Sequence, residues 1–497
     1  MNKKNDFETV IGLEVHAQLK TKTKMFCGCA NEAEAQEPNI NVCPLCMGHP
    51  GTLPVPNEQA IRWTRLAGLA LHCDILRLAK FDRKNYFYPD LPKGYQISQF
   101  DQPFCLNGRF DFIVGDEVRT VHLTRIHLEE DAGKLSHPEK ADYSLVDYNR
   151  AGTPLMEIVT EPDIKSPAEA RAFLQGLRQL LRYLDVSNAD MEKGQMRADA
   201  NISVRTKDGK RTTAIIEIKN MNSFKAVEKA LAYEEERLHE AMQNGEEGDT
   251  TKETRGWDEK SGTTLAQRSK EEAHDYRYFP EPDIPPVTID EKELTKIKQE
   301  LPELPGEKQS RFQKEYKLGL GDIAVLTGSR KTADFYEQVA SELQAWLKNE
   351  DVKLNNPDDA FKLGASYVVN ELVKHFKENN TTVDDLKFSA ENFAEFITIV
   401  MQGKINSSAA QQVLKTMYET GQDPSQIIEE QDLAQVSDEG ELEKVAQNIV
   451  DQNAKAVEDY KKGKEASLKF LVGQMMKETK GKANPEMAAK LIKAIID

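Results

Sequence analysis

Apolar and polar residues alternate along several stretches of the first half of the chain, with the period of two that is typical of β-strands. In residues 11–19 every second position is apolar, and the positions between them include Glu14 and His16. Residues 196–206 repeat the pattern, and their polar positions are Arg197, Asp199, Asn201, Ser203 and Arg205. Because successive side chains of a strand point to opposite faces, each stretch predicts a strand with one apolar and one polar face.

The polar faces of these predicted strands carry unusual residue types. Asp and Asn are depleted from strand interiors because their side chains compete for the local backbone, yet Asp199 and Asn201 stand in mid-strand. A divalent metal would compensate, since Mg²⁺ prefers oxygen ligands and bridges carboxylates to phosphate oxygens. An ordinary solvated sheet face is the alternative. Further carboxylates, amides and cations crowd residues 121–222, among them Glu129, Arg150, Glu217 and Lys219.

Helical periodicity and start signals predict three helices in the same half, over residues 57–78, 166–183 and 226–243. Residues 80–99 mix cations and aromatic residues with Pro and Gly, which predicts an irregular loop. Such a loop is either a packed surface segment or a place where phosphate or a base is held. Residues 244–264 are turn-rich and predict a mobile loop or a hairpin, and four prolines in residues 280–286 exclude a helix there.

Beyond residue 293, Glu, Lys, Gln and Ala dominate with helical periodicity to the C-terminus. The predicted helices lie at about 291–300, 307–317, 321–327, 330–348, 357–377, 388–402, 406–420, 424–430, 438–450, 451–461, 464–477 and after 484–485. The pattern therefore predicts a mixed α+β first domain followed by an all-α second half.

Length and charge bound the class of protein. With 497 residues the chain is long enough for two or three domains. Its net charge of −17 indicates that the surface as a whole is not of the basic kind that binds nucleic acid. Any RNA contact would come from a local basic patch. We expect a cytoplasmic location or, in a eukaryote, a location in an organelle matrix, with no membrane association, because the sequence shows neither a run of roughly 18 apolar residues nor the apolar core of a signal peptide. We also expect no DNA partner.

The cysteines suggest a metal clip. Four of the six form two close pairs separated by a loop, namely Cys27, Cys29, Cys43 and Cys46. Two such pairs suit a tetrahedral zinc site, although the first pair has one intervening residue rather than two. Reduced thiols without metal are the alternative, and disulfides are disfavoured in a chain with no secretion signal. Four thiolates would close the coordination shell, so the zinc would be structural.

Nucleotide-binding loops are not evident in the sequence. The chain has no GxxxxGK[ST] motif, and Gly319-Leu-Gly321 lacks a third glycine and a preceding strand. If the protein uses ATP, its phosphates must therefore be held on a metal-bearing sheet.

Several long motifs, in order along the whole chain, resemble the B subunit of the bacterial aspartyl/glutamyl-tRNA amidotransferases, the GatB family. They are Glu14-Val-His16, the cysteines from Cys27 to Cys46, residues 84–99 (KNYFYPDLPKGYQISQ), 128–134 (LEEDAGK), 147–154 (DYNRAGTP), 197–203 (RADANIS) and 276–283 (YRYFPEPD). Residues 472–484 resemble the YqeY-like tail of that family.

The resemblance implies an antiparallel-sheet cradle domain over residues 1–292, related in fold to glutamine synthetase and guanidino kinases. It further implies a helical domain over 293–405 and a YqeY-like, tRNA-binding tail over 406–497. The implied reaction is the ATP-dependent phosphorylation of the side-chain carboxylate of Glu-tRNA(Gln) or Asp-tRNA(Asn), followed by displacement of phosphate by ammonia.

The resemblance and the polar strand faces together lead to a hypothesis for the site. Glu14, His16, Glu129 and Glu217 are expected to bind metal or handle ammonia, and Asp199 and Asn201 to complete the magnesium and ATP site. Arg150, Arg197 and Lys219 are expected to pair with phosphate, with Ser203 also on the cofactor side. Lys84 and Lys93 would border the tRNA terminus or the ammonia entrance. For each cation a surface ion pair is the alternative.

No Ser/Lys or Cys/His constellation in the sequence suggests a glutaminase, so a partner must release the ammonia. The family supplies it as an amidase subunit (GatA-like), together with a small GatC-like subunit, in a heterotrimer. Two other functions stay open at this point: a stand-alone ATP-dependent carboxylate-amine ligase and a non-catalytic tRNA-binding scaffold.

Overall fold

The alternating stretch near the N-terminus forms the central strand of a nine-stranded sheet in the computed structural model of the protein. The structure describes residues 6–32, 37–115, 117–138, 141–269, 276–348, 357–435, 439–479 and 483–496. The chain divides into two compact units, Met1–Gly306 and Glu307–Asp497. The large sheet and the candidate site belong to the first unit.

The sheet has the order β14-β13-β12-β11-β1-β10-β7-β6-β2. Its strands are β1 (Phe7–Gln18), β2 (Asp74–Ile75), β6 (Cys105–Val114), β7 (Glu117–Glu130), β10 (Pro154–Thr160), β11 (Met196–Thr206), β12 (Ile216–Lys219), β13 (Glu253–Asp258) and β14 (Thr263–Ser269). β12 and β13 pair in parallel, and the other neighbours are antiparallel. The predicted strands at 11–19 and 196–206 are thus confirmed as the neighbours β1 and β11.

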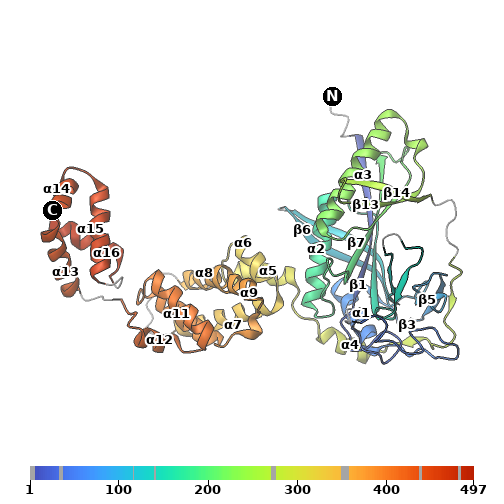
Figure 1. The fold of residues 1–497 in the computed structure, drawn as a ribbon, viewed down its shortest axis with the longest axis horizontal. Helices are drawn as coiled ribbons and strands as arrows, with labels where there is room; N and C mark the ends of the chain where they lie inside the picture. The colour runs from blue at the N-terminus through green and yellow to red at the C-terminus, as the bar shows by residue number, and fades with distance from the viewer. Residues whose placement is uncertain are drawn as a thin grey trace. The chain divides into compact units, whose positions relative to one another are not determined.

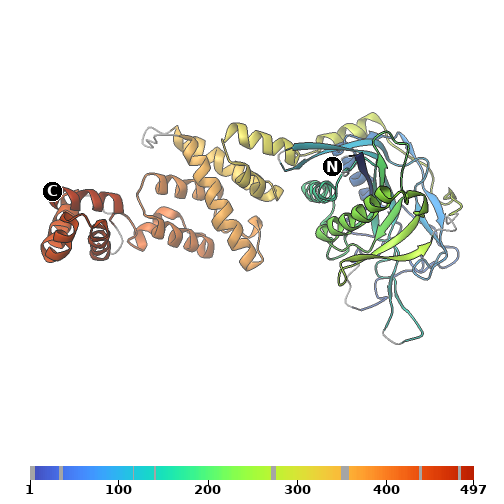
Figure 2. The ribbon, with the colours of Figure 1, turned by 90° about the horizontal axis from the view of Figure 1, so that it is seen from above.

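Two long helices cover the apolar face of this sheet, as Figures 1 and 2 show. They are α2 (Pro167–Tyr183), which starts within one residue of its predicted start, and α3 (Phe224–Asn244), which starts two residues before it. Ser166 accepts a hydrogen bond from the backbone of Glu169, and Ser223 accepts one from Ala226. The helices pack on the buried residues of β1 and β11, including Ile11, Leu13 and Ile202, so the polar positions of both strands face the other way.

The predicted helix over residues 57–78 is wrong at its C-terminal end. The helix α1 spans Glu58–Ala70, and His72 adopts a left-handed backbone with φ +55°. Asp74 and Ile75 of β2 then pair with Leu106 and Cys105 of β6. Backbone pairing at the edge of the sheet satisfies the hydrogen bonds that a continued helix would have made, so tertiary context overrides the helical period.

The expectation of an irregular loop over residues 80–99 is also wrong in part. β4 (Asp82–Asn85) and β5 (Tyr95–Ser98) pair with each other, and β15 (Phe279–Pro280) completes a three-stranded sheet. Only residues 86–94 between the strands are irregular, and they hold the prolines and the glycine. The smaller two-stranded sheets are β3 (Leu78–Ala79) with β16 (Val287–Thr288), and β8 (Lys134–Ser136) with β9 (Leu145–Asp147).

Residues 244–264 include the start of a β-hairpin, one of the two expected outcomes, because β13 and β14 pair antiparallel. A short 3₁₀ turn, η2 (Glu247–Asp249), precedes the hairpin. α4 (Glu291–Gln299) follows the proline-rich segment, and its Leu294 and Ile297 are buried in the core of the first unit. The first compact unit consequently extends past residue 292 to Gly306.

The second unit is helical throughout its described residues, as predicted. Its helices are α5 (Pro305–Glu315, which starts at the end of the first unit), α6 (Leu320–Leu326), α7 (Arg330–Leu347), α8 (Pro357–Tyr367), α9 (Val373–Asn379), α10 (Ala390–Met401), α11 (Ser407–Thr420), α12 (Pro424–Glu430), α13 (Glu439–Gln452), α14 (Ala454–Lys461), α15 (Glu465–Glu478) and α16 (Pro485–Ile496). A π-helical turn (Val368–Leu372) joins α8 to α9 within the predicted 357–377 helix. Residue 438, where one predicted helix starts, lies outside the described residues.

This unit has two separate hydrophobic cores. One surrounds Phe312, Tyr336 and Phe393, and the other lies around Leu442, Met475 and Ile492. Within the described ranges, every helix of the protein is too short or too polar to traverse a bilayer.

Candidate active site and cysteine cluster

The strand register places four polar residues in one row across the middle of the large sheet. His127 on β7 is opposite Glu157 on β10, Glu157 is opposite His16 on β1, and His16 is opposite Arg197 on β11. Directly opposite residues of antiparallel strands project from the same face. Accordingly, one Glu157 carboxylate oxygen, Oε2, lies 3.2 Å from His16 Nε2 and 3.2 Å from His127 Nε2.

Glu129 of β7 joins this row and completes a set of possible metal ligands. Its Oε1 lies 3.6 Å from His16 Nε2. One ligand atom from each of His16, Glu129 and Glu157 lies within 4.8 Å of the other two. Two carboxylates and one imidazole form a donor set that fits a divalent cation and leaves positions for water or phosphate. His16 and Glu129 are predicted site residues, whereas Glu157 is a candidate ligand that the sequence reasoning missed.

The charged side chains in this row lie so close together that they shift one another's pKa values. Burial by itself would lower the pKa of His16, but the hydrogen bond to Glu157 and the charges of Glu157 and Glu129 raise it to about 9. Burial opposes the charge of Glu157 as well, yet His127 and His16 hold the pKa of its carboxyl well below the usual range. A proton on His16 thus takes the place that a bound cation would take between these carboxylates.

A second group of carboxylates lies one row further along β1 and surrounds an ammonium group. Glu14 is opposite Asp199, and Lys219 Nζ lies 2.9 Å from Asp199 Oδ2 and 3.2 Å from Glu217 Oε1. Asn201 donates a hydrogen bond of 3.2 Å to Glu14. Burial and the charges of Glu157, Asp199 and Glu217 raise the pKa of Glu14. Burial alone would lower the pKa of Lys219, but Asp199 and Glu217 raise it.

The two groups border one cavity of about 430 Å³. Its lining includes six predicted site residues, namely His16, Lys84, Glu129, Arg197, Asp199 and Lys219. Glu14, Asn201 and Glu217 do not line the cavity but contact or adjoin Asp199 and Lys219, as described above. Residues of β1, β7, β11 and β12 therefore meet at a common cavity.

Lys84 is a cation of the cavity wall. Its Nζ lies 4.8 Å from the centre of the Tyr276 ring, and Tyr276 also lines the cavity. Burial would lower the pKa of Lys84, but the charges of Glu129, Tyr278 and Glu157 raise it. The ammonium group hence stays charged beside the carboxylates, where it suits a developing negative charge.

Three further predicted residues do not line this cavity and have partners elsewhere. Lys93 Nζ lies 2.5 Å from Glu130 Oε1, and Arg150 donates to the carbonyl oxygens of Ala132 and Gly133 over 2.9 and 2.8 Å. Ser203 is opposite Val10 on β1, and four residues of extended chain separate it from Asp199 by roughly 13 Å. The structure does not bring these three side chains to the cavity, so their predicted roles in binding stay untested.

Asp131 is a further cavity residue that the sequence reasoning did not place in the site. Arg197 donates to its Oδ1 over 2.8 Å, and Gln18 donates to its Oδ2 over 2.9 Å. Burial would raise the pKa of Asp131, but Arg197, Arg150 and Gln18 lower it. Asp131 consequently fixes Arg197 at the cavity wall. The signal for it was the run of three acidic residues at 129–131, of which only the first was assigned a role.

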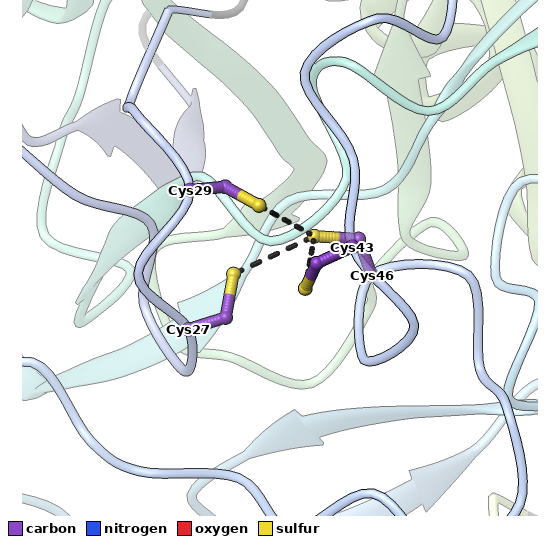
Figure 3. Close-up of side chains that lie close together, drawn as sticks. All are labelled: Cys27, Cys29, Cys43 and Cys46. Atoms are coloured by element: carbon purple, nitrogen blue, oxygen red, sulfur yellow. Dashed lines mark hydrogen bonds between the residues drawn. The ribbon is translucent and has the colours of Figure 1, made fainter.

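The four predicted cysteines converge from two segments (Figure 3). Cys46 Sγ lies 3.5 Å from the sulfur of Cys27, 3.6 Å from that of Cys43 and 3.8 Å from that of Cys29. None of the four forms a disulfide in the structure. A regular tetrahedron with Zn–S bonds of about 2.3 Å has sulfur–sulfur edges of about 3.8 Å, so the cluster has the size of a four-thiolate zinc site.

One thiol of the cluster is strongly acidified. Hydrogen bonding from Cys27 and Cys43 and the charge of Lys24 outweigh burial and lower the pKa of Cys46 to about 4. Burial and the charge of Cys46 raise the pKa of Cys29 to about 11. A thiolate is the metal-binding form of cysteine, so Cys46 supplies one ligand in the form that zinc binds.

The amino-acid sequence of this chain matches known family models over two ranges, one in the sheet unit and one in the helical unit. Residues 9–295 match a family described as the GatB/GatE catalytic domain, and residues 337–496 match a family described as the GatB domain. The chain belongs to the GatB family. This confirms the resemblance seen in the sequence.

Curated relatives are similar in sequence to this chain along nearly their full length. The chain is 48% identical to the B subunit of the aspartyl/glutamyl-tRNA(Asn/Gln) amidotransferase of Thermotoga petrophila over 496 residues, which cover 99% of each chain. It is 47% identical to the corresponding protein of Brevibacillus brevis, again over 99% of each chain. For the corresponding protein of Persephonella marina the identity is 46%, over 99% of this chain and the whole of the relative.

Proposed function

We propose that this protein is the component that converts misacylated Glu-tRNA(Gln) or Asp-tRNA(Asn) to the amide form, with ATP and with ammonia from a partner. The main observation that supports this proposal is the cavity. His16, Glu129 and Asp199 line it together with the cations Lys84, Arg197 and Lys219. Family membership supports the substrate class, because the relatives are named as components of tRNA amidotransferases.

The chemistry of the reaction requires this mixture of charges. A carboxylate is a poor electrophile, and phosphorylation turns its oxygen into a phosphate leaving group. Phosphoryl transfer depends chiefly on positioning and on neutralisation of charge. His16, Glu129 and Glu157 would hold Mg²⁺, with Glu14, Asp199 and Glu217 as a second candidate set. When bound, the metal would neutralise phosphate oxygens.

The chain's own residues then have separate tasks. Arg197, fixed by Asp131, and Lys219, fixed by Asp199, present positive charge to phosphate at the cavity wall. Lys84 offers a third cation at the cavity wall, close to the Glu129 carboxylate. With the metal held by the second set, Glu14, Asp199 and Glu217, the Glu129 carboxylate or the neutral His16 imidazole would accept the proton that ammonia loses when its nitrogen bonds to the acyl carbon.

We further propose that the chain divides into a cradle domain with the fold of glutamine synthetase and guanidino kinases, a helical domain and a YqeY-like tail (406–497). The burial of Leu294 and Ile297 moves the end of the cradle domain from the expected residue 292 to about Gly306. The separate hydrophobic core around Leu442, Met475 and Ile492 supports an independent unit in the last part of this tail, whereas the residues from Ala409 to Ile427 pack in the core around Phe393. In this proposal the tail contacts tRNA, and removing residues after about 406 raises the KM for tRNA.

The proposed assembly is a heterotrimer with a GatA-like glutaminase and a small GatC-like subunit, in the cytoplasm. The relatives are named as one lettered component of an amidotransferase, which supports a multi-subunit enzyme. The proposed zinc is structural, because the four cysteine sulfurs would fill a tetrahedral shell. Metal analysis of the purified chain tests it directly.

Asp199→Ala tests the proposed activity. We expect at least a roughly 100-fold loss of amide formation, about 3 kcal/mol, with tRNA affinity kept. The measurement is amidation of misacylated tRNA by the assembled complex, with Asp208→Ala, at an exposed turn, as the matched control. Unchanged amide formation by Asp199→Ala would instead favour a tRNA-binding scaffold. ADP formation that needs no tRNA would favour a stand-alone ligase acting on a free amino acid.

A further inference from the structure

Lys24 is a buried lysine between the cysteine cluster and the wall of the acidic cavity. Only 1% of its surface is exposed, and an ammonium group without partners would be costly at such a place. Its Nζ donates to Cys46 Sγ over 3.6 Å, to the carbonyl oxygen of Asn41 over 2.9 Å and to that of Tyr148 over 3.3 Å. All three N–H donors of the ammonium group thus have acceptors.

The charge of Lys24 suits a loaded cysteine cluster. Four thiolates around Zn²⁺ carry a net charge of −2, and one adjacent ammonium group cancels half of it. Because Lys24 is buried, this attraction is screened less than it would be at a surface. The side chain therefore belongs to the shell of hydrogen-bond donors that orients metal ligands.

The other side of Lys24 contacts the segment that leads to the cavity. A Cβ on Gly152 would lie 3.5 Å from Lys24 Cδ, and Gly152 has a φ of +85° that favours glycine. The backbone N–H of Met25 donates to the carbonyl oxygen of Gly152 over 2.7 Å, and the N–H of Gly152 donates to the backbone carbonyl oxygen of Asp131 over 2.9 Å. Asp131 in turn receives the hydrogen bond from Arg197. A short chain of hydrogen bonds hence joins residues 24–25 to the cavity cation.

We propose that Lys24 is a positioning residue that couples the loaded cysteine cluster to the placement of Asp131 and Arg197. It binds the Cys46 sulfur and the Tyr148 carbonyl at once, so an assembled cluster adds to the hydrogen bonds that hold the segment 148–152 in position. The metal part of this proposal rests on the zinc site, and the activity part rests on the proposed amidation.

Cobalt substitution tests the contact with the cluster in the full-length chain. Lys24→Met removes the charge and keeps a long side chain, Lys24→Gln keeps one amide donor, and Lys22→Met is a matched control at an exposed lysine two residues away. We expect a shifted thiolate-to-Co²⁺ charge-transfer band in both Lys24 variants. We also expect them to lose the metal at a chelator concentration at least tenfold lower than the wild type. Wild-type bands and wild-type retention in a folded Lys24 variant would overturn the proposal.

The coupling itself is tested by kinetics of the metal-loaded complex. For Lys24→Met and Lys24→Gln we expect kcat for amide formation to fall at least fivefold, while the KM for tRNA stays within twofold of the wild type. Lys22→Met should match the wild type in both constants. A wild-type kcat in a loaded Lys24 variant would refute the coupling.

The failures of the three proposals are distinguishable. A wild-type chain that binds neither zinc nor cobalt overturns the zinc site and, with it, the role of Lys24. A wild-type complex that binds cobalt as expected but forms no amide overturns the proposed function, while the cobalt spectra still decide the contact between Lys24 and Cys46.

Discussion

The acidic cavity and the cysteine cluster are two candidate cation sites in one unit, and they are built differently. The row of His16, Glu129 and Glu157 arises from strand register and opens onto a cavity of about 430 Å³. The four cysteines come from two irregular segments and form a closed set of sulfurs. Three ligands beside a cavity leave room for substrate, whereas four thiolates leave none. The comparison teaches that the first site is suited to chemistry and the second to holding the chain in place.

Glu157→Gln should give the largest effect, because it removes a carboxylate between two imidazoles in the open site. We expect at least a roughly 1000-fold loss of amide formation, about 4 kcal/mol, together with weaker Mn²⁺ binding. Thermal unfolding shows whether the variant folds, and Glu161→Gln at an exposed position is the control. Activity within tenfold of the wild type would contradict the metal role of this row.

Cys43→Ser removes one of the four thiolate ligands, and its main expected effect is a loss of folding stability. At a free zinc concentration 100 times the dissociation constant, loss of binding lowers the free energy of unfolding by about 2.7 kcal/mol. Zinc content and denaturant midpoint should fall together. Cys73→Ala, at a buried cysteine outside the cluster, should keep its zinc. A Cys43→Ser chain with full zinc content and wild-type stability would argue against the structural metal.

Asp131→Asn sharpens the comparison, because Asp131 lies between the two regions. The pKa of Asp131 is lowered in the folded chain, so its carboxylate stabilises the fold above its unfolded pKa near 3.9. That contribution is lost as the pH falls through the lowered pKa. We expect Asp131→Asn to cost about 2 kcal/mol near neutral pH and less towards pH 3. Urea unfolding across pH measures it, and a difference from the wild type that grows in acid would contradict the assignment.

Ser203→Ala should have the smallest effect. Ser203 shares the polar face of β11 with Asp199, but it lies outside the cavity. We expect amide formation within about twofold of the wild type, or 0.4 kcal/mol. A loss of tenfold or more would show that ATP extends along β11 beyond the cavity.

Alternation in the sequence reveals the parts of the site that lie on β1 and β11, where buried and polar positions take turns. β1 and β11 alternate, so Glu14, His16, Asp199 and Asn201 could be assigned to one face. Glu157 could not, because β10 is buried on both faces and shows no alternation. A carboxylate within the apolar run at 154–160 was the remaining signal.

The partners of the cations were beyond the reach of sequence patterns. Lys84 and Lys93 lie in the same motif, yet the first lines the cavity and the second pairs with Glu130. Lys84 lies on β4, which also pairs with the distant strand β15, whereas Lys93 lies in the irregular segment before β5. Pairing with a distant strand is a choice that local patterns do not encode. The same cause explains why the helix α1 ends eight residues before its predicted end.

The packing of α4 against the sheet unit has a practical consequence for dissecting the protein. A fragment stopped at residue 292 would lack Leu294 and Ile297, two side chains that are 6% and 0% exposed. Each contributes roughly 1.5–3 kcal/mol when buried, so the shortened piece would expose an apolar seam and tend to aggregate. Proteolysis or gene truncation aimed at isolating the sheet unit should therefore separate the chain after Gly306.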